Sequence, residues 1–357
     1  MNGLASAGQV AAAPGRAAYR RLTAQRLLVL AGLAALLAAS LVADLTLGPA
    51  RYGYAEVVRA LLGQNVPASV AVVVTEIRLP VALMAAVVGA CLSVSGAQMQ
   101  TVLNNPLASP FTLGISAAAG FGAALGFVLG VTLLPEGWSA WTIPVNAFLA
   151  AMGCSLLIHA LSARRGMGTE TVVLLGIALV FTFNAALAAL EFIASEQALA
   201  AVVFWTMGSL GRTTWPKLGI TVAVLALVWP VFLRQAWALT ALRLGETKAA
   251  SFGIAVGRLR LRTILLVSGL ASVTVAFVGT IGFIGLVGPH IARMLVGEDQ
   301  RFFLPASALA GALVLSAASV LSKSIIPGLI LPIGVVTALV GVPFFFSLIM
   351  STRSRAW

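Results

Sequence analysis

The amino-acid sequence predicts an all-α polytopic membrane protein with about ten transmembrane helices and with both termini in the cytoplasm. Of its 357 residues, 60% are hydrophobic and only 9% are charged, whereas a soluble domain is about a quarter charged. Apolar runs of about 20 residues, the length that crosses a bilayer as a helix, recur along the chain. An outer-membrane barrel would instead show alternating segments of about ten residues, so these long runs exclude one.

Ten apolar runs define the expected spans. They lie at about residues 27–47, 78–100, 111–134, 139–163, 171–193, 216–236, 262–280, 281–296, 304–322 and 331–350. The first follows a basic stretch and is too long for the core of a cleavable signal peptide. The second begins at Arg78-Leu79-Pro80, and proline is tolerated in the first turn of a helix. The eighth is short for a span.

The third span carries a glycine at every fourth position, at Gly122, Gly126 and Gly130. Small residues at this spacing let two helix backbones approach closely in lipid, where dispersion rather than the hydrophobic effect drives helix packing. We therefore expect this helix to pack tightly against a neighbour.

The distribution of Lys and Arg gives the orientation. Sixteen of these 22 residues fall in segments on one side of the expected membrane and six fall on the other. The richer side is cytoplasmic because Lys and Arg resist translocation. This bias explains the net charge of +12 without a nucleic-acid partner, since no basic stretch is interleaved with exposed aromatic residues. We expect a basic, mobile cytoplasmic tail at residues 1–26 and a transmembrane domain at 27–357.

The chain carries no motif of an enzyme or of a metal site, such as a phosphate-binding glycine loop or a zinc-ligand spacing. Cys91 and Cys154 lie inside apolar runs and are expected to be packing residues. Neither a cofactor nor a metal is therefore expected in this chain. Glu191 is the only acid expected within a spanning helix, whereas ion-coupled carriers usually bury ionisable groups at mid-membrane. The energy for transport is thus expected from outside the chain, with an ion-coupled secondary carrier as the alternative.

The loop after the sixth span, at about residues 243–258, is the best candidate for receiving that energy. It is rich in small residues with helical propensity, and Gly245, Gly253 and Gly257 interrupt it. Two short helices lying along the membrane could present alanine and phenylalanine side chains to a partner. An ordinary basic loop is the alternative interpretation.

A series of ordered motifs runs from about residue 70 to residue 350. They read Arg78-Leu79-Pro80, Ser95-Gly96-Ala97-Gln98, Asn105-Pro106-Leu107-Ala108-Ser109-Pro110, Trp205-Thr206-Met207-Gly208-Ser209-Leu210, Leu244-Gly245-Glu246, Gly282-Phe283-Ile284-Gly285-Leu286-Val287 and Leu331-Pro332-Ile333-Gly334. In order and spacing they resemble the permease subunits of bacterial ATP-binding-cassette (ABC) importers for iron–siderophore, haem and cobalamin, the FecCD/vitamin-B12 type. The chain departs from that pattern at Val81, Ile330 and Gln300, where the family usually has an arginine, an acid and a histidine.

The resemblance implies a set of partners. Each subunit would have ten helices. It would pair with a second permease copy, either identical or a close paralogue, and the pathway would run between the two copies. Two cytoplasmic ATPase subunits would bind ATP and Mg²⁺ and dock from the inside, and an extracytoplasmic substrate-binding protein would dock from the outside. The chain itself would then be a non-catalytic subunit in the bacterial inner membrane.

The resemblance also implies roles for individual residues. Contact with the ATPase would fall to Leu244, Gly245, Glu246, Ala249, Ala250, Phe252 and Gly253. Thr169 and Glu170 match the position of the cytoplasmic gate, and Arg78 and Lys323 match outward-facing basic residues that meet the binding protein. Spans five and ten would line the route, which makes Asn184 and Thr337 candidate pathway residues, with packing inside the subunit as their alternative role.

The function predicted from the sequence is therefore that of an importer permease. An iron–siderophore complex is the expected cargo, because the segment Ser109-Pro110-Phe111-Thr112-Leu113-Gly114 resembles siderophore permeases more than cobalamin permeases. Haem or cobalamin is the alternative within the same family.

Overall fold

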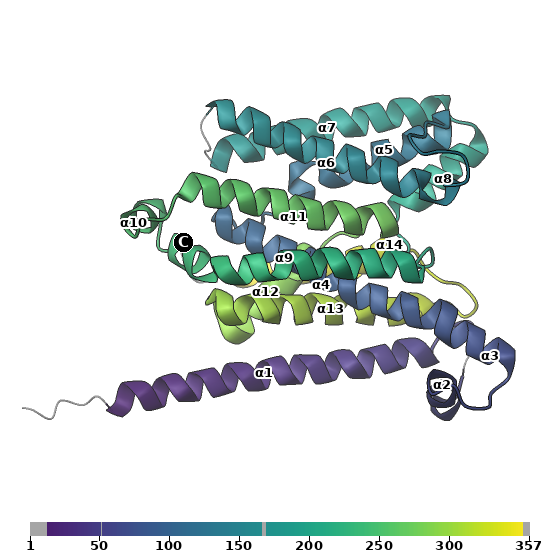
Figure 1. The fold of residues 1–357 in the computed structure, drawn as a ribbon, viewed down its shortest axis with the longest axis horizontal. Helices are drawn as coiled ribbons and strands as arrows, with labels where there is room; N and C mark the ends of the chain where they lie inside the picture. Colours follow the sequence, from purple (N-terminus) through teal and green to yellow (C-terminus); the bar gives the residue numbers. More distant parts are fainter. Residues whose placement is uncertain (1–12, 51, 166–168, 353–357) are drawn as a thin grey trace, which may run out of the picture.

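The computed structural model of the chain describes residues 13–50, 52–165 and 169–352. Across these residues the backbone is helical or irregular, and no β-strand forms. Figure 1 shows the long helices lying side by side and roughly parallel, with the short helix α10 at one end of the bundle and α2 and α3 at the other. The predicted all-α fold is confirmed.

The elements follow one another with short connections. In chain order they are α1 (Ala13–Thr46), α2 (Tyr54–Leu61), α3 (Ala68–Val72), the π-helix η1 (Val73–Arg78), α4 (Leu79–Val102), the 3₁₀-helix η2 (Pro110–Leu113), α5 (Ile115–Leu129), α6 (Ser139–Arg165), α7 (Thr169–Ile193), α8 (Glu196–Thr206), α9 (Trp215–Leu242), α10 (Glu246–Ser251), α11 (Val256–Val278), α12 (Ile284–Val296), α13 (Gln300–Ser324) and α14 (Ile333–Thr352).

Ten apolar helices account for the ten predicted spans. Within the described residues, seven stretches are long and apolar enough to cross a membrane: Ala17–Thr46, Ala68–Val102, Ser139–Ser162, Thr171–Ile193, Trp215–Leu242, Val256–Val278 and Gln300–Ser324. Three shorter apolar helices, Ile115–Leu129, Ile284–Val296 and Ile333–Phe346, coincide with the third, eighth and tenth predicted spans. Each of the three begins two to four residues later than predicted, because irregular or 3₁₀ backbone that contains glycine or proline precedes it. The tenth, α14, keeps its predicted length of 20 residues.

The first helix starts earlier than the apolar run that predicted it. α1 begins at Ala13, so the second half of the predicted tail, residues 13–26, is helical rather than mobile. Alanine and arginine have high helix propensity, and they continue the helix past the end of the apolar run. Residues 1–12 lie outside the described residues. α1 begins and α14 ends at the end of the bundle that carries α10 (Figure 1), as an even number of spans requires.

The centre of the bundle is held together by direct backbone contact. α4 packs extensively against α13, α12 and α11. A β-carbon added at Gly89 would overlap the carbonyl oxygen of Gly311 on α13, and one added at Gly96 would overlap that of Gly285 on α12. Glycine is therefore required at these crossings, as it is wherever membrane helices pack backbone to backbone. The result is a closely packed three-helix body formed by α4, α12 and α13.

The glycines of the third span behave as predicted at two of their three positions. Gly122 and Gly126 face α6, where a β-carbon would overlap the carbonyl oxygen of Asn146 or come within 2.6 Å of the Ile143 side chain. The predicted close packing of this helix is confirmed there. Gly130 has no neighbour within 4 Å and ends α5 with a φ of +66°. The prediction was wrong at Gly130, which ends the helix instead of packing against a second one.

Three irregular segments meet at the end of the bundle opposite α10. The Ser209 amide donates to the carbonyl of Val278 at 2.7 Å, and the amides of Ile333 and Gly334 donate to the carbonyls of Gly208 and Met207 at 3.2 and 3.1 Å. Backbone groups at membrane depth must be satisfied within the protein because lipid offers no hydrogen bonds. This junction therefore fixes the start of α14 relative to the end of α11 and the end of α8.

Alanine substitution at two glycines should change stability in opposite directions. Gly96→Ala places a methyl group against the Gly285 backbone and should lower the free energy of unfolding by about 1–3 kcal/mol, the usual cost of overpacking. Gly153→Ala, on an open face of α6 with nothing within 4 Å, should be neutral or stabilise by up to about 1 kcal/mol through helix propensity. Thermal unfolding of the detergent-solubilised protein measures both. Equal shifts of the two melting temperatures would contradict the packing described here.

Candidate functional site

The predicted coupling segment, residues 243–258, is a compact projection between α9 and α11. Its helix α10 covers only Glu246–Ser251. Gly245 and Gly253 flank it with φ angles of +105° and +80°, conformations that glycine adopts without strain. One short helix forms where two were predicted, because the rest of the segment continues into α11, which begins at Val256.

The outer surface of the coupling segment is apolar. Leu244 and Phe252 are 59% and 54% exposed, and Ala250 beside them is exposed as well. The ring of Phe252 lies against the exposed Trp237 on α9, with the ring centroids 6.3 Å apart. Ala249 is fully buried, so its predicted contact with a partner is replaced by packing inside the subunit. Trp237 was missed because it falls between the sixth predicted span, 216–236, and the predicted coupling segment, and α9 in fact continues past it to Leu242.

An ion pair attaches this segment to the body of the protein. The Glu246 carboxylate pairs with the guanidinium of Arg260 on α11, and the Arg260 Nε donates to the carbonyl oxygen of Val102, the last residue of α4, at 3.2 Å. Arg260 is buried, whereas the Glu246 side chain is 61% exposed. Glu246 can therefore meet a partner while it is joined to two long helices.

The turn between α12 and α13 carries a second group of charges at the same end. Asp299 caps α13 by accepting from the Arg301 amide at 3.2 Å. The Arg301 guanidinium donates to the Asp299 carboxylate at 2.7 Å, which lowers the pKa of Asp299 below its ordinary value. Arg26 of α1 lies 3.5 Å from the same carboxylate and over the ring of Phe302. The basic part of α1 is thus attached to the bundle.

The two predicted gate residues stand at the start of α7. Thr169 and Glu170 are the first residues of that helix and follow residues 166–168, which lie outside the described residues. Their side chains also lie outside the part of the chain that the structure describes. Their role as a gate stays a prediction.

The two predicted pathway residues have different surroundings. Asn184 is exposed near the middle of α7, on a helix whose surface also exposes Leu174 and Phe181. Thr337 is buried on α14, and its hydroxyl donates to the carbonyl of Gly334 at 3.1 Å. Asn184 is therefore available to a second copy or to cargo, whereas Thr337 takes the packing role that was its alternative.

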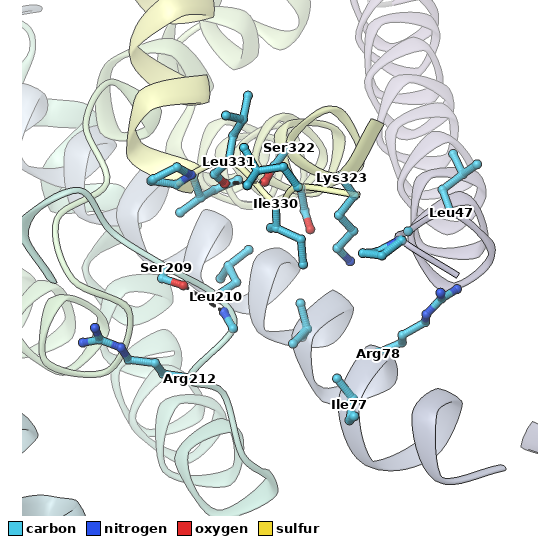
Figure 2. Close-up of a pocket in the computed structure, with 18 of the residues that line it drawn as sticks. Leu47, Ile77, Arg78, Ser209, Leu210, Arg212, Ser322, Lys323, Ile330 and Leu331 are labelled. Carbon is cyan, nitrogen blue, oxygen red and sulfur yellow. Dashed lines mark hydrogen bonds between the residues drawn. The ribbon is translucent and has the colours of Figure 1, made fainter. Parts of the chain in front are cut away.

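A pocket of about 690 Å³ opens at the end of the bundle opposite α10. It lies between the segment after α1, η1, the connection from α8 to α9, and the α13–α14 connection. Its wall is mainly apolar, with residues such as Leu47, Ile77, Leu210 and Ile330, and it includes no acid among the described lining residues. Its basic side chains come from opposite sides: Figure 2 shows Arg78 and Lys323 on one side and Arg212 on the other.

Arg78 does not have the exposed guanidinium on which its predicted docking role depended. The residue is 7% exposed, and its guanidinium donates to the carbonyl oxygens of Leu45 at 2.7 Å, Thr46 at 3.2 Å and Ala50. The Tyr52 ring lies 4.6 Å from it. Arg78 thus binds the carbonyl groups that are left unpaired where α1 ends, so the expectation of an outward-facing side chain was wrong.

Lys323 is also mostly covered and paired. Its ammonium lies 3.0 Å from the carboxylate of Asp44 on α1, and its side chain is 9% exposed. Asp44 is fully buried and accepts a further hydrogen bond from Ser319 at 3.0 Å. The expectation that Glu191 is the only acid within a spanning helix was wrong, because Asp44 lies within α1. The signal in the sequence is an aspartate inside the first apolar run and a lysine just after the ninth.

Comparison with known proteins identifies the family. A model of the FecCD transport family matches residues 36–351. The chain is 39% identical over 306 residues to a putative ABC transporter permease protein of Methanocaldococcus jannaschii, which covers 84% of this chain and 87% of that protein. It is 39% identical to the hemin transport system permease protein HmuU of Yersinia pestis, over 78% of this chain and 84% of the relative. It is 35% identical to the vitamin B12 import system permease protein BtuC of Vibrio vulnificus, over 78% of this chain and 82% of the relative.

A solved structure has the same fold. An inward-facing putative metal-chelate type ABC transporter superposes with a TM-score of 0.80 and 29% identity, and the match covers 90% of this chain and 99% of that one. The family model covers the whole segment that carries the ordered motifs, from Arg78 to Gly334. The chain therefore belongs to the FecCD transport family, and it is a multi-pass protein of the inner membrane.

Proposed function

We propose that the chain is the permease subunit of an ABC importer and that it carries a large metal chelate, an iron–siderophore complex, across the inner membrane. The observation that carries this proposal is the coupling segment: an apolar surface of Leu244, Ala250 and Phe252 projects from one end of a ten-helix body. A separate ATPase bound there would supply the energy. Relatives named for hemin, vitamin B12 and iron chelatin transport support this class of cargo, with haem and cobalamin as the alternatives.

A second copy of the chain is the proposed partner within the membrane. The exposed face of α7 carries Asn184 among large apolar side chains. A side-chain amide facing hydrocarbon without a hydrogen bond costs a few kcal/mol, and the Asn184 amide makes no hydrogen bond within the described residues. A protein partner or a polar pathway beside this face removes that cost. α7 is therefore proposed to face the second copy across the transport route.

The ion-coupled alternative has one structural observation in its favour, the buried Asp44. Buried acids in membrane helices often bind the coupling ion. In this protein the carboxylate is paired with the Lys323 ammonium and accepts from Ser319. Because the charge is balanced and its hydrogen bonds are satisfied, the pair is better explained as a link between α1 and α13. The ABC importer therefore remains the proposal.

Transport by the reconstituted protein should require ATP. Proteoliposomes that contain the permease, its cognate ATPase subunits and the binding protein should take up the iron chelate only when ATP is supplied. Liposomes with the permease alone should show no uptake under a proton or sodium gradient. Radioactive iron measures uptake in both cases. Uptake driven by an ion gradient without the ATPase would overturn the proposal in favour of a secondary carrier.

Removing the apolar tip of the coupling segment should weaken ATPase binding. Phe252→Ala is expected to cost about 2 kcal/mol, which corresponds to roughly thirty-fold weaker association, because buried aromatic residues dominate interface energies. The matched control is Phe192→Ala, a residue that is 90% exposed and lies near the end of α7 that is remote from α10. Binding of the purified ATPase to each variant measures the effect. Equal affinities for the two variants would place the ATPase elsewhere.

The role of Asn184 can be separated from lipid exposure. Asn184→Leu should reduce chelate uptake by roughly 5- to 150-fold if the amide faces a second copy or the route, since an unpaired polar partner costs about 1–3 kcal/mol. Asn184→Gln keeps the amide and should retain most of the uptake. A leucine variant that transports as well as the unmodified protein would show that this position faces lipid, where leucine is favourable.

A further inference from the structure

We infer that the last turn of α4, residues 98–102, receives the motion of the coupling segment, and that Arg260 and Glu298 are the positioning residues that transmit it. The inference rests on the proposed function, because it assumes that an ATPase moves that segment. The inference identifies the helix that moves when the ATPase moves the coupling segment. The observation behind it is that two separate chains of ion pairs and hydrogen bonds leave the coupling segment and end on the same turn.

The first chain starts on α10. Glu246 pairs with the buried guanidinium of Arg260, and Arg260 donates to the backbone carbonyl of Val102 at 3.2 Å. Val102 is the last residue of α4, where helix carbonyls have no partner within the helix. A charge-assisted hydrogen bond is stronger than a neutral one, so the chain firmly joins the partner-facing carboxylate to the end of α4.

The second chain starts just before Leu244. The guanidinium of Arg243 lies 2.6 Å from the Glu298 carboxylate, which also lies 2.9 Å from Arg293 on α12. Arg293 donates to the Gln100 side-chain oxygen at 2.8 Å, and the Gln100 amide donates to the Gly285 carbonyl at 3.3 Å. Glu298 is thus the shared acid between a cation of the coupling segment and a cation that holds α4.

A third group of hydrogen bonds joins the last turn of α4 to the start of α13 and the end of α9, at the end of the bundle that carries α10. Gln300 at the start of α13 accepts from Gln98 at 3.0 Å and donates to Thr101 at 2.9 Å. The backbone N–H of Gln300 donates to the Thr240 hydroxyl, near the end of α9, at 3.3 Å. Gln98, Gln100, Thr101 and Gln300 are all at most 1% exposed. The Gln98 side-chain oxygen has no hydrogen-bond partner among the described residues, but the bonds of Gln300 to Gln98, Thr101 and Thr240 still join the ends of α4, α9 and α13.

Movement of α4 would be passed on by close packing. The glycine contacts with Gly311 and Gly285 leave no space for α4 to slide independently of α13 and α12. A β-carbon at Gly341 of α14 would overlap Phe283, the residue just before α12. At its other end α4 follows Arg78, which holds the end of α1 and lines the outer pocket. A displacement of the last turn of α4 therefore reaches both α14 and the outer pocket.

The test compares two neighbouring acids with opposite expectations. Glu298→Gln removes the charge between Arg243 and Arg293, and it should lower the amount of chelate transported per ATP hydrolysed at least tenfold in the reconstituted complex. Binding of the ATPase subunits should change less than twofold, because Glu298 lies outside the apolar tip. Glu298→Asp keeps the charge and should restore a substantial part of the transport per ATP hydrolysed. A residue that only supports the fold would not need the charge for this recovery.

The matched control is Asp299→Asn. Asp299 pairs with Arg26 and Arg301, and its carboxylate forms no ion pair or hydrogen bond with α4 among the described residues. Asparagine caps a helix as well as aspartate. This variant should keep the ratio of the unmodified complex. If Glu298→Gln does not fold, Glu246→Gln tests the first chain at an exposed carboxylate and should also lower the ratio.

The outcomes separate this inference from the proposed function. If the unmodified complex shows no ATP-dependent uptake, the proposed function fails. If it transports but the Glu298 and Glu246 variants keep its ratio of transport to hydrolysis, the transmission through α4 is wrong. Transmission through α4 is also wrong if Asp299→Asn lowers the ratio as much as Glu298→Gln.

Discussion

The structure depends on helix packing that the hydrophobic effect does not provide. In lipid, separating two apolar helices exposes no surface to water, so only dispersion, hydrogen bonds and close approach hold them together. The glycines on α4, α12 and α13 meet this requirement because they bring backbone against backbone at Gly89–Gly311 and Gly96–Gly285. The polar contacts at both ends of the bundle are arranged around this three-helix centre. The same glycine contacts make the centre move as one body.

Charged side chains form ion pairs at both ends of the bundle. The backbone junction of residues 207–209, 278–280 and 333–334 satisfies its own hydrogen bonds at one end. Asp44 and Lys323 neutralise each other there. At the other end, Glu298 lies between Arg243 and Arg293. Because unpaired charge in a membrane is costly, these positions are where the chain can carry charge without losing stability.

The sequence predicts the spans well and the neighbours of each side chain poorly. Hydropathy and the distribution of Lys and Arg indicated ten helices, and the glycines around α10 marked the coupling segment. Arg78 and Lys323 were expected to face outward, yet Arg78 is buried and the Lys323 side chain is only 9% exposed. Hydropathy along the chain cannot tell that Lys323 meets Asp44, which lies 279 positions earlier. It also placed the start of α1 too late, since charged residues at a helix end reduce hydropathy without reducing helix propensity.

α4 connects these observations. Between Leu79 and Val102 it carries no charged residue, so its position is set by packing along its length and by charges at its ends. Arg78 fixes the outer end to α1, and the guanidinium of Arg260 holds the inner end. A helix that is held at both termini and packed closely between them transfers a displacement along its axis, because it has no flexible point to absorb one. The central helix, rather than the exposed α7 or α14, is thus best placed to link the coupling segment with the outer pocket.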